Sequence, residues 1–229
     1  MIAGDVHIGA GRRRAEKPGQ LVDPEVELEV KGPPPYVSRG GVKLANALDT
    51  LKVPVEGRMA LDVGASTGGF TDCLLQRGAA HVIALDVAYG ELDWRIREHE
   101  RVTVIERTNA RSITPDDLPY APDLIVSDVS FISLTKVLPA VLATAGPTFD
   151  CLAMVKPQFE VGKDRIGKGG VVRDLELRRE AVRTVAASVD VAVMGSAPSA
   201  LAGPSGNRET FLWLAEPGRP GAVEEVDAW

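Results

Sequence analysis

The most informative stretch of this chain is Leu61-Asp62-Val63-Gly64-Ala65-Ser66-Thr67-Gly68-Gly69-Phe70. It continues a short apolar run from Met59, and such a run is typical of a strand buried on both faces of a parallel sheet. The run breaks at Gly64, and two more glycines precede a helical pattern. Glycine is needed where the backbone turns sharply or passes close to a ligand, because a Cβ atom would collide there. A strand, a glycine turn and a helix N-terminus together predict a site of nucleotide size.

The spacing of the glycines narrows the class of ligand. A dinucleotide-binding loop has the pattern G-x-G-x-x-G and a P-loop ends in G-K-[ST], whereas this loop reads Gly64-x-x-x-Gly68-Gly69 and has no lysine. The carboxylate of Asp62 would repel a diphosphate but suits a ligand with an ammonium or sulfonium group. The loop resembles the first motif of the S-adenosyl-L-methionine-dependent methyltransferases. The glycines alone are also compatible with an ordinary strand–turn–helix junction.

The composition is that of a globular α/β protein. A chain of 229 residues with 45% hydrophobic and 25% charged residues suits one α/β domain with a small appendage. No apolar run approaches the roughly 20 residues of a membrane helix, and Asp5, His7 and Arg12 interrupt any signal-peptide core. Cys73 and Cys151 lie in apolar segments, so the sequence predicts neither a disulfide framework nor a metal site. We therefore expect a cytoplasmic protein without a membrane partner.

The distribution of charge along the chain indicates whether it could bind a nucleic acid. The net charge of −6 argues mildly against one, but local basic clusters matter more than the total. Basic residues gather at residues 12–17 and in the glycine-rich stretch 162–173, and each cluster could also be ordinary solvated surface. We expect Gly162 to Gly170 to form a mobile loop over a substrate or a plain flexible loop. Residues 1–9 and 17–22 resemble the second half of the RNA-binding module of ribosomal-protein type; the two helices that come first in that module are not in this sequence, which leaves RNA affinity open.

The chain divides into three expected parts. Residues 1–35 predict a β-rich remnant with strands at 6–8 and 26–30, followed by the stiff linker Gly32-Pro33-Pro34-Pro35. Residues 36–216 are expected to form the main domain, and residues 217–229 a flexible tail. In the main domain the patterns predict helices at 36–52, 71–77, 91–100, 134–144 and 175–188. They predict strands at 59–63, 81–86, 102–106, 123–128, 150–157, 189–194 and 209–214.

This alternation predicts an α/β fold with a Rossmann-like, mostly parallel sheet of seven strands and an antiparallel last strand. In such a sheet the ligand site lies beyond the carboxyl ends of the strands. Four polar residues stand at predicted carboxyl ends: Asp62, Asp86, Asp128 and Lys156. Glu209 begins its strand, and an antiparallel direction would bring it to the same edge. Lys43 could join them from the helix before the first strand.

The resemblance to a family becomes specific over five ordered motifs: Ser38-Arg39-Gly40-Gly41-x-Lys43-Leu44, Asp62-Val63-Gly64-x-x-x-Gly68-Gly69-Phe70, Ser127-Asp128-Val129-Ser130-Phe131-Ile132, Val155-Lys156-Pro157-Gln158-Phe159-Glu160 and Gly206-Asn207-x-Glu209. They resemble the TlyA family, hemolysin-named ribosomal RNA 2'-O-methyltransferases with an FtsJ-like catalytic domain. The resemblance extends from Tyr36 to Glu216. It implies methyl transfer from S-adenosyl-L-methionine to a ribose 2'-hydroxyl, with cytidine in ribosomal RNA or ribosomal subunits as the substrate.

The resemblance also implies the site residues. The family's catalytic tetrad falls on Lys43, Asp128, Lys156 and Glu209. Asp86 follows the glycine turn by about 20 residues, a spacing that suits hydrogen bonds to ribose hydroxyls, and Asn109 stands where methyltransferases contact adenine. The expected cofactor-binding residues are Asp62, Gly64, Ala65, Ser66, Thr67, Gly68, Gly69, Phe70, Asp86, Asn109 and Asp128.

The chemistry requires that a weakly acidic hydroxyl lose its proton. Lys156 is the candidate base, although an ordinary lysine has a pKa of about 10.4. The positive charge of Lys43 and desolvation would lower the pKa of Lys156. The carboxylates of Asp128 and Glu209 would oppose this change, so we expect them to orient the lysines and not to act as bases. Lys156 could instead stay charged and orient the hydroxyl while the proton leaves to water. Each of the four could by itself be part of a surface ion pair.

Three other functions remain open at this point. The family's name suggests a membrane-acting hemolysin, which the lack of a spanning or basic amphipathic segment disfavours. A methyltransferase-like domain that only binds RNA is a second alternative. An NAD-dependent enzyme is disfavoured by the glycine spacing and Asp62. The sequence leaves the target nucleotide and the oligomeric state open.

Overall fold

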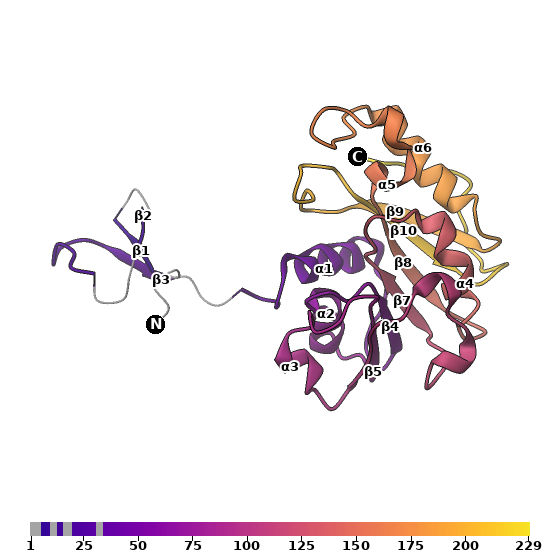
Figure 1. The fold of residues 1–229 in the computed structure, drawn as a ribbon, viewed down its shortest axis with the longest axis horizontal. Helices are drawn as coiled ribbons and strands as arrows, with labels where there is room; N and C mark the ends of the chain where they lie inside the picture. Colours follow the sequence, from indigo (N-terminus) through magenta and orange to yellow (C-terminus); the bar gives the residue numbers. More distant parts are fainter. Residues whose placement is uncertain (1–5, 10–12, 16–19, 31–33) are drawn as a thin grey trace. The chain divides into compact units, whose positions relative to one another are not determined.

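The computed structural model describes residues 6–9, 13–15, 20–30 and 34–229. The chain forms two compact units, residues 1–35 and residues 36–229. Figure 1 shows the helices and strands of both units.

The first unit contains a three-stranded antiparallel sheet in the order β2-β1-β3, with β1 at Val6–Ile8, β2 at Arg13–Arg14 and β3 at Leu28–Val30. The predicted strand at 6–8 is confirmed, and the predicted strand at 26–30 begins two residues later. The short strand β2 lies between these two strands, where no strand was predicted. Gly32 and Pro33 of the proline-rich linker lie outside the described residues.

The second unit contains a seven-stranded sheet in the order β6-β5-β4-β7-β8-β10-β9. Strand β10 alone runs opposite to the other six strands, since it is antiparallel to both β8 and β9, so the predicted fold class is confirmed. The strands are β4 Met59–Val63, β5 His81–Leu85, β6 Val102–Ile105, β7 Leu124–Ser127, β8 Asp150–Val155, β9 Ala192–Pro198 and β10 Thr210–Ala215.

The helices are α1 Arg39–Leu51, α2 Gly69–Gln76, α3 Trp94–Arg97, α4 Leu138–Leu142, α5 Pro157–Glu160 and α6 Leu175–Ala186, and short 3-10 turns are η2 Ala110–Ser112, η3 Pro115–Asp117, η4 Leu134–Lys136 and η5 Lys163–Arg165. The helix predicted at 91–100 is present but much shorter, at Trp94–Arg97. The side chain of Asp93 accepts the backbone N–H of Arg95, which makes Asp93 the N-cap and sets the start of the helix at Trp94. Only one helical turn follows. The helix predicted at 134–144 is split between η4 and α4, where Pro139 lacks the N–H that would continue the preceding turn.

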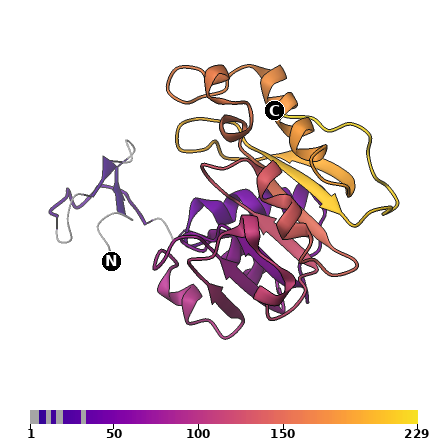
Figure 2. The same ribbon diagram turned by 45° about the vertical axis from the view of Figure 1, so that its right-hand side comes forward.

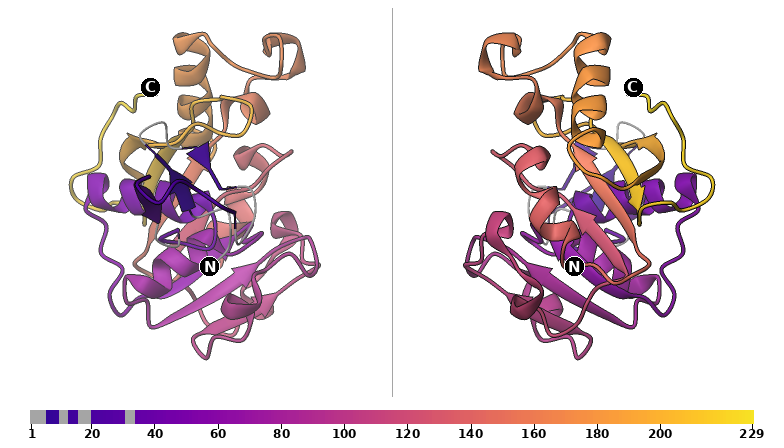
Figure 3. Two further views of the ribbon diagram at one scale, coloured as in Figure 1. Left: turned by 90° about the vertical axis from the view of Figure 1, so that its left-hand side faces the viewer. Right: turned by 90° about the vertical axis from the view of Figure 1, so that its right-hand side faces the viewer.

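Side chains of alternate residues in the strands point to two apolar layers. In β8, Cys151, Ala153 and Val155 face one layer, and Leu152 and Met154 face the other. Helices α1 and α2 cover the second of these faces, and α4 and α6 cover the first (Figures 2 and 3). Because both faces are covered, the strands read as continuous apolar runs.

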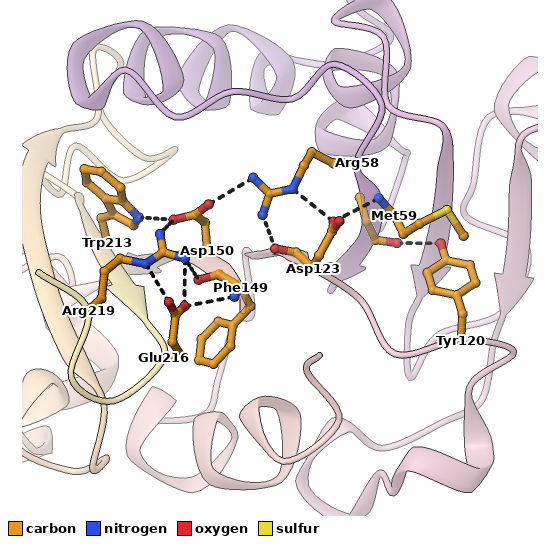
Figure 4. Close-up of polar contacts among 10 residues, drawn as sticks. Arg58, Met59, Tyr120, Asp123, Phe149, Asp150, Trp213, Glu216 and Arg219 are labelled. Carbon is orange, nitrogen blue, oxygen red and sulfur yellow. Dashed lines mark hydrogen bonds and ion pairs between the residues drawn. The ribbon is translucent and has the colours of Figure 1, made fainter. Parts of the chain in front are cut away.

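An ionic network closes the amino-terminal edge of the parallel strands (Figure 4). Asp150, the first residue of β8, accepts hydrogen bonds from Arg58 at 3.0 Å, from the indole of Trp213 at 2.9 Å and from Arg219 at 2.5 Å. Arg219 also binds Glu216, just after β10. The network therefore joins the segments that flank β4, β8 and β10 at the edge opposite the predicted site.

Residues 217–229, which were expected to form a flexible tail, contact the rest of the second unit. The N–H of Val223 donates to the carbonyl of Val193 at 2.7 Å, and Asp227 pairs with Arg179 of α6 at 2.6 Å. Ala228 is buried. None of the described helices combines the length and the apolar character that crossing a bilayer requires.

The Arg219–Glu216 pair predicts a pH dependence of stability. The hydrogen bonds from Arg219 lower the pKa of Glu216 to about 2 from an ordinary value of 4.5. The stabilisation is therefore complete above about pH 4.5 and is lost as the pH falls toward 2. We expect Glu216→Gln to lower the free energy of unfolding by about 1 kcal/mol at pH 7, with a smaller difference at pH 3, in urea titrations.

The exposed Glu224 supplies the control, because no ion pair joins it to another described residue. Glu224→Gln should leave the pH dependence of the wild type unchanged. A Glu216→Gln effect of equal size at pH 7 and pH 3 would contradict the assignment.

Candidate active site

The four predicted tetrad residues meet at the carboxyl edge of the parallel strands. Lys43 lies on α1, Asp128 follows β7, Lys156 follows β8, and Glu209 precedes β10. Two ion pairs form among them, Lys43 Nζ with Glu209 Oε2 and Lys156 Nζ with Asp128 Oδ1, each at 2.5 Å. Lys156 Nζ also donates to Ser130 Oγ at 2.8 Å. Each lysine is thus held by its own carboxylate.

These charges are largely withdrawn from water. Lys43 is 7% exposed, Lys156 is 9% exposed and Glu209 is 3% exposed. Removing one member of a buried pair leaves the other charge desolvated and unpaired, which is strongly destabilising. The pairing therefore holds the two ammonium groups in defined positions.

The start of α1 places Lys43. Ser38 caps the helix by accepting the N–H of Gly40 at 3.2 Å. A Cβ atom on Gly41 would lie 2.3 Å from the ring of Tyr36, so only glycine lets this ring pack against the first turn. Leu44 and Leu48 then anchor the helix in the core, which directs Lys43 to the edge of the sheet.

The glycine loop packs closely against its surroundings. Gly64 has a φ of +85°, and a Cβ atom there would lie 2.8 Å from the carbonyl oxygen of Asp128. A Cβ atom on Gly69 would lie 2.1 Å from Ser38 Oγ, so the starts of α1 and α2 touch at this point. The backbone N–H of Ser66 donates to Asp86 Oδ2 at 2.7 Å. The loop is thereby fixed to α1, β5 and the end of β7.

Two connected clefts run along this loop. The first, of about 430 Å³, is lined by Asp86 and Asn109 among others. It continues past Gly64, Ser66 and Asp128 into a second cleft of about 220 Å³, which contains Lys43, Lys156 and Phe70. Ala65, Thr67 and Gly69 also line the second cleft.

A third cleft, of about 400 Å³, adjoins the second and shares Lys156 and Ser130 with it. We call it the substrate cleft; its lining residues include Phe131, Phe159, Gln158, Asn207 and Glu209. Lys156 therefore stands between the glycine-loop clefts and the substrate cleft.

Asp62 and Gly68 lie beneath these clefts. The side chain of Asp62 is fully buried, and Oδ2 accepts the hydroxyl of Thr71 at 2.7 Å. Oδ1 has no hydrogen-bond partner among the described residues, and burial raises the pKa of this carboxyl to about 7. A Cβ atom on Gly68 would point toward the side chain of Leu92 and not into a cleft.

Comparison with known proteins decides the family. The model of the FtsJ-like methyltransferases matches residues 36–216. The chain belongs to this family. The 16S/23S rRNA (cytidine-2'-O)-methyltransferase TlyA of Mycobacterium tuberculosis is 49% identical over 217 residues, which are 90% of this chain and 81% of that protein. Hemolysin A of Brachyspira hyodysenteriae is 40% identical over 79% of this chain and 75% of its own length.

Solved structures agree with this assignment. A hemolysin-named protein of Lactococcus lactis has a TM-score of 0.80 at 38% identity, covering 84% of this chain and 94% of its own. Fibrillarin of Aeropyrum pernix, solved with S-adenosyl-L-methionine bound, has a TM-score of 0.54 at 16% identity over 86% of this chain and 85% of its own. The second likeness shows the fold alone.

Several residues of this FtsJ-like site were not predicted individually. Phe131 and Gln158 stand inside the quoted motifs, but a motif does not say which of its side chains faces a cleft. Phe131 is 91% exposed with a φ of +64°, and its ring centroid lies 5.3 Å from that of Phe159. The Oε1 atom of Gln158 is buried without a partner among the described residues. The positive φ of Phe131 and the acceptor atom of Gln158 that lacks a hydrogen-bond donor both depend on the fold. No sequence pattern therefore indicates them.

The close contact at Gly69 gives a test of the loop geometry. We expect Gly69→Ala to lower the free energy of unfolding by about 1–3 kcal/mol, because the new methyl group would overlap Ser38 Oγ and approach the backbone nitrogen of Gly41. Chemical denaturation measures the change. Gly146→Ala is the matched control, since its Cβ would meet no atom closer than 3.7 Å. Equal effects of the two substitutions would refute the packing described here.

Proposed function

We propose that this protein transfers a methyl group from S-adenosyl-L-methionine to the 2'-hydroxyl of a ribose in ribosomal RNA, with cytidine as the target nucleoside. The observation that carries the proposal is the pair of lysine–carboxylate contacts where the glycine-loop clefts meet the substrate cleft. The 49% identity to a protein named for this reaction supports it.

The clefts along the glycine loop fit the cofactor. Asp86 accepts the N–H groups of Ser66 and Ala88, at 2.7 and 2.8 Å, which fixes its carboxylate at the rim where ribose hydroxyls would bind. Asn109 lines the same cleft, where adenine would lie. The unpartnered oxygen of Asp62 beneath the loop suits a ligand that carries positive charge. When bound, S-adenosyl-L-methionine supplies an electrophilic methyl group on a sulfonium.

Lys156 is placed to act on the ribose hydroxyl. Its Nζ is held by Asp128 and Ser130 and borders the substrate cleft. It either accepts the proton of the 2'-hydroxyl or orients this group while the proton leaves to water. Lys43 and Glu209 form the second pair next to it. Most of the rate would come from alignment of the attacking oxygen with the methyl group, which fixed side chains favour.

The substrate cleft suits an unstacked nucleotide. Two phenylalanine rings border Lys156, and Phe131 is almost fully exposed. A non-glycine residue held at positive φ is strained, and such strain gathers at functional sites. Proteins that recognise single-stranded RNA stack its bases on aromatic side chains. A base stacked on Phe131 would place its own ribose beside Lys156.

The first test is transfer of a tritiated methyl group to ribosomal subunits from a strain of the source organism that lacks this gene. We expect Lys156→Ala to lower the rate at least about 100-fold, since it removes the group that handles the proton. Cofactor affinity, measured by calorimetry, should change little. Lys136→Ala, at an exposed lysine, is the control.

Three outcomes separate the alternatives. Wild-type transfer that Lys156→Ala abolishes supports the proposal. Equal transfer by the wild type and Lys156→Ala would contradict the role of the tetrad. Cofactor binding without any transfer to subunits would favour a domain that only binds RNA.

A second prediction concerns the aromatic pair. We expect Phe131→Ala to raise KM for the subunits about 10- to 100-fold, because stacking on one base contributes about 1–3 kcal/mol. Phe131→Trp should retain a KM near that of the wild type, and neither change should affect cofactor affinity. A KM for Phe131→Ala equal to that of the wild type would exclude stacking at this position.

A further inference from the structure

A group of basic side chains lies on or next to the segments that line the substrate cleft, and the proposed chemistry does not use it. We call Lys168, Arg173, Arg178 and Arg208 the basic cluster. The first two lie in and just after the glycine-rich stretch that follows α5, the third lies on α6, and the last lies just before β10. The segment after α5 and the turn between β9 and β10 are at the same end of the unit (Figures 1 and 2).

Asn207 holds these segments together. Its side chain is 1% exposed, its Oδ1 accepts the N–H of Val172 at 2.9 Å, and its Nδ2 donates to the carbonyl of Gly170 at 2.8 Å. Arg208 directly follows Asn207, and Arg173 directly follows Val172. The two hydrogen bonds therefore bring the two arginine-bearing segments side by side at the wall of the substrate cleft.

Arg178 is held within this group without being satisfied. Its Nη1 donates to the carbonyl of Arg173 at 3.3 Å, while its Nε is buried and has no hydrogen-bond partner among the described residues. Burial, and then the positive charge of Arg208, lower the pKa of Arg178. A buried donor without an acceptor is costly, and an anionic ligand would supply the acceptor.

The cationic side chains of the cluster form no ion pair within the described part of the chain, although the negative charge of Asp174 acts on Arg178. No ion pair there includes Lys168, Arg173, Arg178 or Arg208, whereas Arg165 pairs with Glu180 and Arg179 pairs with Asp227. Asp174 is the nearby carboxylate, and its Oδ1 is engaged by the N–H groups of Glu176 and Leu177 at the start of α6. The cluster thus has four cationic side chains and one nearby carboxylate.

We propose that the basic cluster binds a backbone phosphate of the RNA strand beside the nucleotide that enters the substrate cleft. The identity of the ligand rests on the proposed function. Arg208 lies between Asn207, which lines the cleft, and Glu209 of the tetrad, so a phosphate next to the target ribose comes within reach. Guanidinium groups match the oxygens of phosphate, and such contacts set the register of a strand. Here the contact aligns the ribose with Lys156.

The test measures how the affinity of the full chain for ribosomal subunits from the gene-deleted strain depends on salt. We expect Arg208→Gln and Arg178→Gln each to weaken binding about 3- to 10-fold near 50 mM salt, and to reduce the slope of log K against log salt by about 0.7, the value for one contact to a single strand. Arg208→Lys should keep the slope of the wild type. The cofactor affinity should stay unchanged.

Arg183→Gln is the matched control, because Arg183 lies on α6 and its guanidinium is 3.9 Å from Glu176. An unchanged slope in Arg208→Gln, an exposed position that leaves the fold intact, overturns the proposal, as does an equal loss in Arg183→Gln. The phosphate site and the proposed function can fail separately. If the wild type transfers no methyl group but Arg208→Gln still lowers the slope, the reaction is wrong and the phosphate site is supported.

Discussion

The antiparallel pairing of β10 with β8 is the constraint on which the active site depends. Thr210 pairs with Val155, so Glu209 and Lys156, the residues just beyond that pair, lie at the same edge of the sheet. A parallel β10 would carry Glu209 to the opposite edge, about 20 Å away for a strand of six residues. Lys43 would then lose its carboxylate. The direction of β10 thus assembles the Lys43–Glu209 pair, whereas the parallel strands β7 and β8 bring Asp128 and Lys156 together.

Charged and polar side chains lie at both edges of the sheet, but the two edges differ in how fully these side chains are hydrogen-bonded. At the amino-terminal edge, Asp150 has three donors, and this edge acts as a structural clamp. At the carboxyl edge, Asp62 and Gln158 each retain an oxygen without a partner among the described residues. Buried polar atoms are normally satisfied, so these two exceptions favour this edge as the side where ligands bind.

The order of elements was predictable because each strand of the parallel core is a short apolar run. Residues that interrupt a helix or strand pattern stand in each turn. Helix lengths were less predictable. The pattern at 91–100 has helical character, but the side chain of Asp93 caps the chain inside it. The break at Pro139 likewise depends on how the segment meets the sheet. Local preference gives the type of an element more reliably than its ends.

The sequence by itself determined the fold class and the glycine loop, and it predicted the four polar residues that meet at the carboxyl edge, because these depend on local patterns and on residues at strand ends. Only the tertiary structure decided which lysine pairs with which carboxylate, that Asp62 lies beneath the clefts, and that Asn207 ties Arg208 to Arg173. These features join segments up to 166 residues apart. They follow from strand register and side-chain packing, which no local pattern contains.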